Sequence, residues 1–396
     1  MILNRKQEEG LKTAVARFHD GEPYTCIAGF AGAGKSTLIT FIISALGLDP
    51  AKVAYCAFTG KAANVLKQKG CPNPVTAHKL LYRSKALPNG GYIHEPRDVL
   101  ENDFQLIIVD EISMLPKDMW ELLLSHGVHI IACGDPGQLP PIDKSQNNGV
   151  LDHPHIFLDE IMRQAQESEI IRLSMHVREG RPLSSFEAAG AQVKIVSRND
   201  VTPGMLKWGD QILCAMNKTR NEINQAIRQF DGRGAEPEVG DKIIGLTNHW
   251  DFFSTNGESS LTNGAIGEIT RIQPLSVYLP PSIYPERKLD ILDIDMATED
   301  GDRFHQIPVD YLALTTGQKA LTGEQEFRLK KSKKIMFPAP YDFAYSYAIT
   351  VWKAQGSEWD KVLLYEESFP FDKEEHQKFL YTGITRSSEK LIVVKK

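Results

Sequence analysis

The sequence predicts an α/β protein with parallel sheets, and three observations lead to that class. Short apolar strands alternate with helical stretches through the first half, as in YTCIAGF, KSTLITFIISALG, VAYCAF and GKAANVLKQKG. Two further strand-like runs, FQLIIVDE and VHIIACGD, are apolar almost throughout. A glycine-rich loop, GFAGAGKST, joins the first strand to the first of these helices. This rhythm is typical of a parallel sheet covered by helices on both faces.

Composition limits the class of protein further. A chain of 396 residues is too long for one compact core, so we expect two or more domains. The formal net charge of -6 excludes a surface covered in positive charge, and a nucleic-acid site would therefore be a local groove. No apolar run is long enough to cross a bilayer, and the start MILNRKQEEGLKTAVARF has an amphipathic helix pattern rather than that of a signal peptide. Five isolated cysteines predict reduced core thiols and a cytosolic setting.

The second half begins another α/β sheet and is then interrupted. The strand QILCAMN and the helix KTRNEINQAIRQF open it, and FAYSYAITVWKAQG, KVLLYEE and KLIVVKK return to it near the end. Between about Pro237 and Pro340, short β runs joined by turns predict a small inserted barrel. In the first half, the polar stretch RSKALPNGGYIHEPRDV with its NGG turn predicts a protruding hairpin.

The loop GFAGAGKST fits the pattern G-x-x-x-x-G-K-[ST], which binds phosphate. Its glycines allow backbone amides to point at a β-phosphate, and the following helix adds its positive end. Lys35 would reach the β- and γ-phosphates, and Ser36 would ligate Mg²⁺. The expected nucleotide contacts are Gly32, Ala33, Gly34, Lys35, Ser36 and Thr37.

Carboxylates and an amide follow two of the predicted strands. Asp110 and Glu111 end LIIVDE, where Asp110 can hold the metal and Glu111 can activate water. Gln138 in GDPGQLPP can sense the γ-phosphate, although a turn with a surface glutamine has the same pattern. Arg163 in IMRQ and Arg386 in YTGITRSS are candidates to stabilise phosphoryl charge, and both also fit ordinary surface arginines.

Together these segments resemble superfamily 1 helicases, and more closely the SF1B branch of RecD-type and Dda-like enzymes. The matching pieces occur in family order along nearly the whole chain: LNRKQ, GFAGAGKST, AFTGKAA, TAHKLL, LIIVDEISM, GDPGQLPP, IMRQ, LTNGAIGEI, YAITVWKAQGSEWD and LYTGITRS. One alone would be weak, but ten in sequence are specific. The hairpin and the barrel match only in position and texture.

The resemblance implies a fold and a set of domain boundaries. Two RecA-like P-loop NTPase domains would cover 1–82 with 103–175, and 176–238 with 340–396. The hairpin at 83–102 would be a pin inserted in the first domain, and 239–339 would be an SH3-like β-barrel insertion in the second.

The resemblance also implies residue roles. Gln7 would read the adenine edge; Lys35, Ser36, Asp110 and Glu111 would serve phosphate, Mg²⁺ and water; and Gln138, Arg163 and Arg386 would sense the γ-phosphate. Gly356 and Glu358 would lie near the ribose and phosphates. The track for a single strand would include Phe58, Thr59, Lys61, His78, Thr350 and Lys353.

Three features keep two interpretations each. Trp352 stands where related sequences commonly have histidine, and it either stacks on a base or fills the core of the second domain. The hairpin, with Tyr92 or Pro88 meeting the last base pair, is either a duplex-splitting pin or a surface loop. The basic run 328–334, RLKKSKK, either guides the strand or is a solvated charge run.

The function expected from the resemblance is ATP-dependent unwinding of DNA, with translocation 5′ to 3′ on a single strand. The rivals are a translocase that displaces proteins without unwinding and an ATP-switched binding module. The expected cofactors are ATP and Mg²⁺, and the expected partners are single-stranded and forked DNA, with no membrane. Candidate protein partners are a single-strand-binding protein and other replication or recombination proteins. A monomer in bacterial or phage-infected cytoplasm is expected.

Overall fold

The computed structural model describes residues 3–86, 92–141, 144–162, 166–255, 257, 259–299, 301–331, 339–367 and 372–396. The chain divides into two compact units. The first comprises Met1–Arg83, His94–Ala215 and Thr350–Lys396, and the second comprises Ser84–Ile93 and Met216–Ile349. Each unit is described by itself. Within the described ranges, no helix combines the length and apolar character needed to span a membrane.

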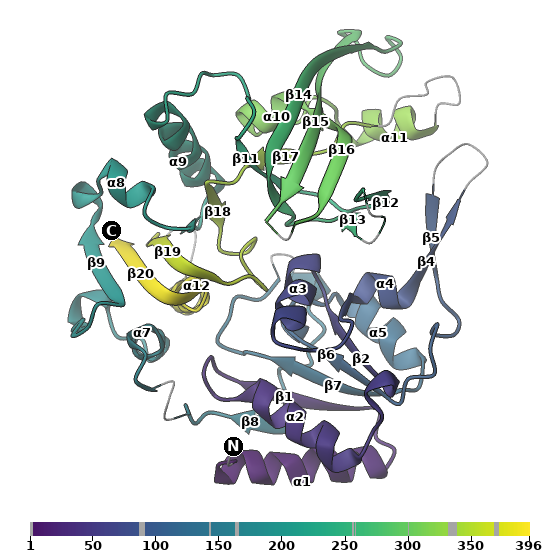
Figure 1. Ribbon diagram of the computed structural model, residues 1–396, viewed down its shortest axis with the longest axis vertical. Helices are drawn as coiled ribbons and strands as arrows, with labels where there is room; N and C mark the ends of the chain where they lie inside the picture. The colour runs from purple at the N-terminus through teal and green to yellow at the C-terminus, as the bar shows by residue number, and fades with distance from the viewer. Residues whose placement is uncertain are drawn as a thin grey trace. The chain divides into compact units, whose positions relative to one another are not determined.

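The first unit contains a six-stranded sheet in the order β3-β2-β6-β7-β1-β8 (Figure 1). All of its strand pairs are parallel. The strands are β1 (Tyr24–Gly29), β2 (Val53–Ala57), β3 (Val75–Thr76), β6 (Leu106–Val109), β7 (His129–Gly134) and β8 (Ile156–Leu158). The predicted parallel sheet is therefore confirmed, and its central strands are buried on both faces, as their continuous apolar sequence requires.

Helices cover both faces of this sheet. On one face, α1 (Arg5–His19) and α2 (Lys35–Leu46) place Ala14, Leu38 and Ile42 in a core with Ile108 of β6. On the other face, α4 (Ala77–Leu81) and α5 (Lys117–Ser125) pack with a second core that includes Ile107. Ile107 and Ile108 belong to opposite cores because successive strand side chains alternate between faces. The short helix α3 (Gly60–Gln68) lies beside β2 and β3.

The first unit also contains a second parallel array, in the order β10-β19-β20-β9. Its strands are β9 (Val193–Ser197), β10 (Gln211–Cys214), β19 (Trp359–Tyr365) and β20 (Ser387–Lys395), with β18 (Ala348–Thr350) at the unit boundary. Its helices are α7 (Glu169–Arg178), α8 (Pro203–Leu206) and α12 (Lys373–Ile384), and α7 packs against α12 and β20. This sheet is the predicted second α/β sheet.

Five short 3-10 helices lie along the described part of the first unit: η1 (Pro50–Lys52), η2 (Ile112–Met114), η3 (Lys144–Gln146), η4 (Leu183–Ser185) and η5 (Arg198–Asp200).

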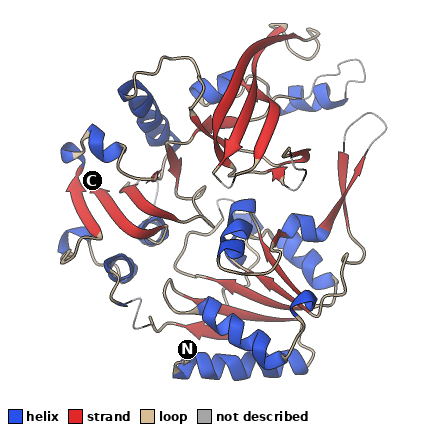
Figure 2. Cartoon of the chain, in the orientation of Figure 1, coloured by secondary structure: helices blue, strands red, loops and turns tan. Residues whose placement is uncertain are grey.

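The second unit is built on an antiparallel sheet in the order β16-β15-β14-β11-β17 (Figure 2). Its strands are β11 (Lys242–Gly245), β14 (Ile266–Tyr278), β15 (Lys288–Thr298), β16 (Arg303–Asp310) and β17 (Phe343–Tyr345), and β12 (His249–Phe253) pairs with β13 (Ser260–Leu261). The helices are α9 (Asn217–Phe230), α10 (Tyr311–Thr316) and α11 (Gly323–Lys331). The predicted β texture between 237 and 340 is thus confirmed, while its SH3-like character stays a prediction.

An ion pair attaches α9 to the antiparallel sheet. Arg228 Nε lies 3.0 Å from Asp241 Oδ1, and both side chains are almost fully buried. Asn224 of the same helix donates to the carbonyl oxygen of Tyr345, which ends β17. The helix therefore belongs to the second compact unit, whereas the sequence analysis grouped it with the second α/β sheet. The predicted division into four domains remains a proposal.

The predicted hairpin forms from β4 (Tyr82–Ala86) and β5 (Tyr92–Pro96), which make a two-stranded sheet. At its base, Arg83 and Glu95 form an ion pair at 3.3 Å. The strands end at Pro96, earlier than the predicted limit of 102. The turn residues 87–91, including Pro88, lie outside the described residues, as does the side chain of Tyr92.

Candidate nucleotide-binding site

The phosphate loop connects β1 to α2 at the carboxyl edge of the first sheet. Helix α2 begins at Lys35, and Gly34 before it has φ +81°, in the left-handed region that favours glycine. A Cβ at Gly34 would also collide with Nε2 of Gln7. The Lys35 ammonium donates to the carbonyl oxygens of Gly29 at 2.7 Å and Phe30 at 3.3 Å. The loop thus has the backbone geometry that the motif predicts.

Asp110 and Glu111 follow β6 at the same edge of the sheet. Asp110 Oδ1 accepts a hydrogen bond from the backbone N–H of Glu111 at 3.0 Å. Desolvation by the surrounding protein and the charge of Glu111 raise the pKa of Asp110, while the nearby Lys35 lowers it. Glu111 itself has φ 51°, an uncommon conformation for a residue other than glycine. Such local strain often occurs at functional sites.

Asp135 is a third carboxylate at this edge, and the sequence analysis did not assign it. It follows β7, the strand between β6 and β1, and its side chain is only 2% exposed. Burial raises the pKa of Asp135, whereas Lys35 and a hydrogen bond from Tyr381 lower it. The signal was present in the sequence, because Asp135 ends a strand as Asp110 does, but Gln138 was the residue singled out there.

Gln138 lies in the loop that Asp135 begins. Its side chain is 8% exposed, and its Oε1 has no hydrogen-bond partner within the described part of the chain. The backbone N–H and the backbone carbonyl of the next residue, Leu139, both form hydrogen bonds with residues from segments around the second sheet. Its N–H donates to Thr382 Oγ1 at 2.9 Å, and its carbonyl accepts from Gln355 Nε2 at 2.7 Å. Neither Thr382 nor Gln355 was among the predicted site residues.

The two predicted arginines have different outcomes. Arg386 is 6% exposed and follows α12, where its guanidinium donates to the carbonyl oxygens of Thr382 at 3.1 Å and Ser357 at 3.3 Å. Thr382 in turn accepts a hydrogen bond from Leu139, so Thr382 connects Arg386 to the loop that carries Gln138. It is a buried residue rather than the surface arginine of the alternative interpretation. Arg163 lies outside the described residues.

Three residues predicted to contact nucleotide are engaged with protein. Gln7 is fully buried; its Oε1 accepts from the N–H of Asn4 in the capping box of α1, and its Nε2 lies 3.4 Å from the Gly34 carbonyl. Gly356 has φ +72°, and a Cβ there would lie 2.9 Å from Cβ of Ala62 in α3. Glu358 forms an ion pair with Lys69, with 3.9 Å between Oε2 and Nζ. Nucleotide contacts by Gln7 or Glu358 would require these protein contacts to be exchanged, and their roles remain proposals.

Two segments carry most of the predicted strand-track residues: the start of α3 with the residue before it, and the segment 350–359. Thr59 caps α3 by accepting from the N–H of Ala62 at 3.1 Å, and the Lys61 ammonium lies over the Trp359 ring, 4.1 Å from its centroid. Because Gly356 also packs against α3, the segment 350–359 adjoins this helix. The remaining predicted residues are Phe58, partly buried; His78, stacked on Tyr82; Thr350, buried; and Trp352 and Lys353, both partly exposed.

The residues at this edge fit a nucleoside triphosphate with Mg²⁺. Mg²⁺ in such sites keeps several waters and binds one or two carboxylates together with substrate phosphates. Asp110 supplies a carboxylate, and Ser36 supplies an exposed hydroxyl in the first turn of α2. The free Oε1 of the buried Gln138 is a polar atom that lacks a protein partner in the described chain. We infer that Asp110 and Ser36 would hold the metal, which would neutralise phosphate charge.

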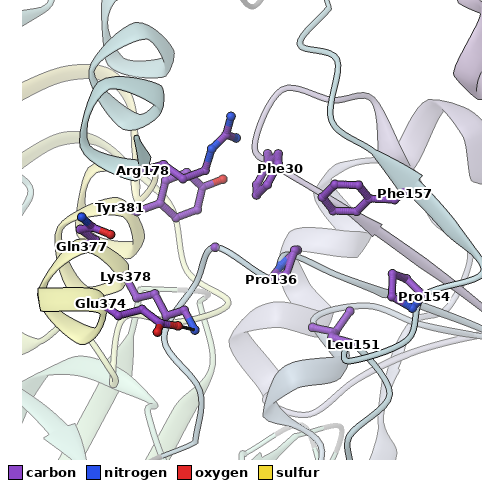
Figure 3. A pocket seen from close by; sticks show the side chains of 11 residues that line it. Phe30, Pro136, Leu151, Pro154, Phe157, Arg178, Glu374, Gln377, Lys378 and Tyr381 are labelled. Carbon is purple, nitrogen blue, oxygen red and sulfur yellow. Dashed lines mark ion pairs between the residues drawn. The ribbon is translucent and has the colours of Figure 1, made fainter. Parts of the chain in front are cut away.

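A recess of about 530 Å³ lies beside the phosphate loop (Figure 3). Phe30 of the phosphate loop and Phe157 of β8 line one side, while Arg178 of α7 and Tyr381 of α12 line the other. The Arg178 guanidinium lies over the Phe30 ring, 3.5 Å from its centroid. Glu374 and Lys378 of α12 form an ion pair at 2.8 Å at the rim. The recess is thus bounded by both sheets' elements.

Two family models match the chain. An AAA domain model matches residues 2–200, about half of the chain, and a UvrD-like helicase C-terminal domain model matches residues 345–394. The chain is 25% identical over 421 residues to the ATP-dependent RecD2 DNA helicase of Deinococcus radiodurans, covering 98% of this chain and 49% of that relative. It thus spans about half of RecD2. It is 21% identical over 427 residues to the ATP-dependent DNA helicase dda of Enterobacteria phage T4, covering 97% of each.

A solved structure has a similar fold. The crystal structure of Pif1 helicase from Bacteroides in complex with ADP-AlF3 and ssDNA aligns with a TM-score of 0.53 at 16% identity, over 99% of this chain and 92% of that one. The AAA model covers half of this chain. The helicase C-terminal model covers β18, β19, α12 and nearly all of β20, which belong to the second sheet and its helices. The chain therefore belongs to the family of the AAA domain model and, with relatives named as RecD2, Dda and Pif1 helicases, to helicase superfamily 1B.

Proposed function

We propose that the chain is an ATP-dependent DNA helicase that translocates on single-stranded DNA and unwinds duplex DNA. The observation that carries this proposal is the pair of hydrogen bonds to Leu139. The loop that carries Gln138 is held by Gln355 and Thr382, from segments around the second sheet. A change at the γ-phosphate that moved Gln138 would therefore act directly on those segments.

The chain's own residues divide the hydrolytic work. Lys35 would leave the carbonyl oxygens of Gly29 and Phe30 to bind the β- and γ-phosphates. Glu111 would take a proton from the attacking water, and Gln138 would orient that water through its free Oε1. Arg386 and Arg163 would stabilise the charge on the transferring phosphoryl group. Gln7, Gly32, Ala33, Gly34, Thr37, Gly356 and Glu358 would complete nucleotide binding.

Strand movement would follow from alternating closure. ATP would draw the two RecA-like domains together because it contacts both, and hydrolysis would remove the γ-phosphate link. Phe58, Thr59, Lys61 and His78 would grip the strand from the first domain, and Thr350, Trp352 and Lys353 from the second. Alternating grip would turn closure into steps. The 5′ to 3′ direction rests only on the branch resembled. The isolated cysteines support a cytoplasmic setting, and a monomer that works with a single-strand-binding protein completes the proposal.

ATPase assays with and without single-stranded DNA, combined with unwinding of duplexes that carry a 5′ or a 3′ tail, test the proposal. We expect strand-stimulated hydrolysis and unwinding of the 5′-tailed duplex. Stimulation without strand separation would favour a translocase that displaces proteins. Hydrolysis indifferent to added strand would favour an ATP-switched binding module. Single-stranded RNA in the same ATPase assay measures the preference for DNA.

Shortening the hairpin is expected to impair unwinding more than translocation, if it acts as a pin that splits the duplex. Removing Lys85–Ala86 and Tyr92–Ile93 deletes two residues from each strand and so preserves the alternation of side chains. Unwinding of a forked duplex and the rate of strand-stimulated hydrolysis would be measured on the same preparation. Equal losses of both would contradict the pin and favour the surface-loop interpretation.

Trp352→Ala is expected to weaken binding of single-stranded DNA by about 1–3 kcal/mol, the usual value of one base stacked on an aromatic ring. The residue is partly exposed rather than buried in the core. Trp352→Phe should retain most of the affinity because a ring remains. Fluorescence anisotropy of a labelled oligonucleotide measures binding, and thermal unfolding serves as control. A lowered Tm with unchanged strand affinity would support the core interpretation instead.

A further inference from the structure

One hydroxyl group connects three parts of the candidate ATPase site. Tyr381 lies in α12 and is 1% exposed. Its Oη donates to Asp135 Oδ2 at 2.6 Å and accepts from the backbone N–H of Ala31 at 2.8 Å. Ala31 is inside the phosphate loop, and Asp135 begins the loop that carries Gln138. Figure 3 shows the ring reaching from α12 toward Phe30.

The ring of Tyr381 is fitted closely to its partner loop. A Cβ added at Gly137 would lie 3.0 Å from the ring, so glycine allows the loop backbone to approach it. The other oxygen of Asp135, Oδ1, accepts from the N–H of Gly137 at 2.9 Å. The loop, the carboxylate and the ring therefore form one packed group. Movement of any member would require the others to move or to break a hydrogen bond.

Burial keeps the Tyr381 hydroxyl available as a hydrogen-bond donor. Burial and the neighbouring Asp135 carboxylate raise the pKa of Tyr381 well above its ordinary value, so its hydroxyl stays protonated and remains a donor. Burial raises the pKa of Asp135, and the charge of Glu111 adds to this rise, while Lys35, Tyr381 and the Gly137 N–H oppose it. With Asp135 ionised, the bond from Tyr381 is charge-assisted, and such bonds are about twice as strong as neutral ones.

We propose that Tyr381 is a positioning residue that couples the phosphate loop and Asp135 to α12. The same helix carries Thr382, which binds Leu139, and leads directly into Arg386. A nucleotide-induced shift of the phosphate loop would thus reach the second sheet through Tyr381 as well as through the two hydrogen bonds of Leu139. The recess of about 530 Å³ beside the ring leaves space for α12 to move. This inference rests on the helicase function proposed above.

The Tyr381→Phe variant tests this coupling, because it keeps the ring and removes only the hydroxyl. We expect the strand-stimulated kcat to fall about tenfold, the scale of one lost hydrogen bond to a charged group, while KM for ATP changes less than about twofold. Tyr365→Phe is the matched control: Tyr365 is also buried, in β19, with its ring near Arg198, and should retain full stimulation. A stimulated kcat of Tyr381→Phe within about twofold of the unmodified chain would overturn the proposal.

A double-mutant cycle with Asp135→Asn shows whether Tyr381 acts through that carboxylate. In the Asp135→Asn background, Tyr381→Phe should lower the strand-stimulated kcat by less than about a further twofold, because the charged acceptor is already lost. Full additivity would overturn the proposed route. Asp135→Asn alone should also lower strand stimulation, which keeps the test available if Tyr381→Phe lowers the Tm. Absence of stimulation in the unmodified chain would instead refute the helicase function, so the two failures are distinguishable.

Discussion

Lys35→Ala is expected to lower strand-stimulated ATP hydrolysis by roughly 10²–10³-fold or more, the usual effect of removing one group that stabilises transition-state charge. The side chain stands at the first residue of α2, where backbone N–H groups and the helix dipole also favour phosphate. It is the cation of the phosphate loop, and its removal would leave phosphate charge without that partner. Within the described residues, its hydrogen bonds go to carbonyl oxygens of its own loop, so the fold should persist.

The measurement is a coupled ATPase assay with single-stranded DNA, together with thermal unfolding. Lys12→Ala is the matched control, because Lys12 is an exposed lysine on α1. That variant should hydrolyse ATP at the unmodified rate. If Lys35→Ala retained strand-stimulated turnover while remaining folded, the assignment of GFAGAGKST as the phosphate loop would be wrong.

Glu111→Gln is expected to lower kcat by roughly 10²–10⁴-fold, the range for loss of a general base. Glutamine has nearly the same shape but cannot accept the proton of the attacking water. ATP binding should be retained. The charge of Glu111 raises the pKa of Asp110, so its loss lowers that pKa and leaves the proposed metal ligand more readily ionised.

Single-turnover hydrolysis and equilibrium nucleotide binding separate these two effects. Glu121→Gln supplies the matched control, since Glu121 is an exposed carboxylate on α5 of the same domain. A kcat loss smaller than about tenfold would show that another group activates the water. Asp135, the other carboxylate at this edge of the sheet, would then be tested first.

Local patterns were sufficient for the elements that carry the site. The apolar runs LIIV and HIIACG became buried strands because continuous hydrophobic sequence suits strands covered on both faces. The loop GFAGAGKST adopted its predicted strand–loop–helix setting because glycine at position 34 allows a left-handed backbone. The β texture of the second unit was also readable, since turn residues separate its strands. All of these signals depend on neighbours within a few residues.

The partners across the fold were not readable in this way. Tyr381 and Asp135 are 246 positions apart, and neither local sequence specifies the other. The sequence analysis therefore noted the segments that contain them but assigned no role to either residue. The same holds for Gln355, whose amide binds the carbonyl of Leu139, and for Lys61, whose ammonium lies over Trp359. The grouping of α9 with the antiparallel sheet depends on the buried pair Arg228–Asp241 and was equally hidden.

The sequence by itself determined that this chain has a parallel sheet with a P-loop motif, a second α/β sheet interrupted by β structure, and the ordered motifs of its helicase superfamily. Periodicity, glycine placement and motif order can be recognised from the sequence alone, because each depends on short segments and their order along the chain. Only the tertiary structure decided which side chains meet at the carboxyl edge of the first sheet. Those meetings depend on packing between distant segments, where a buried hydroxyl and a buried carboxylate each need a partner that folding alone brings within reach.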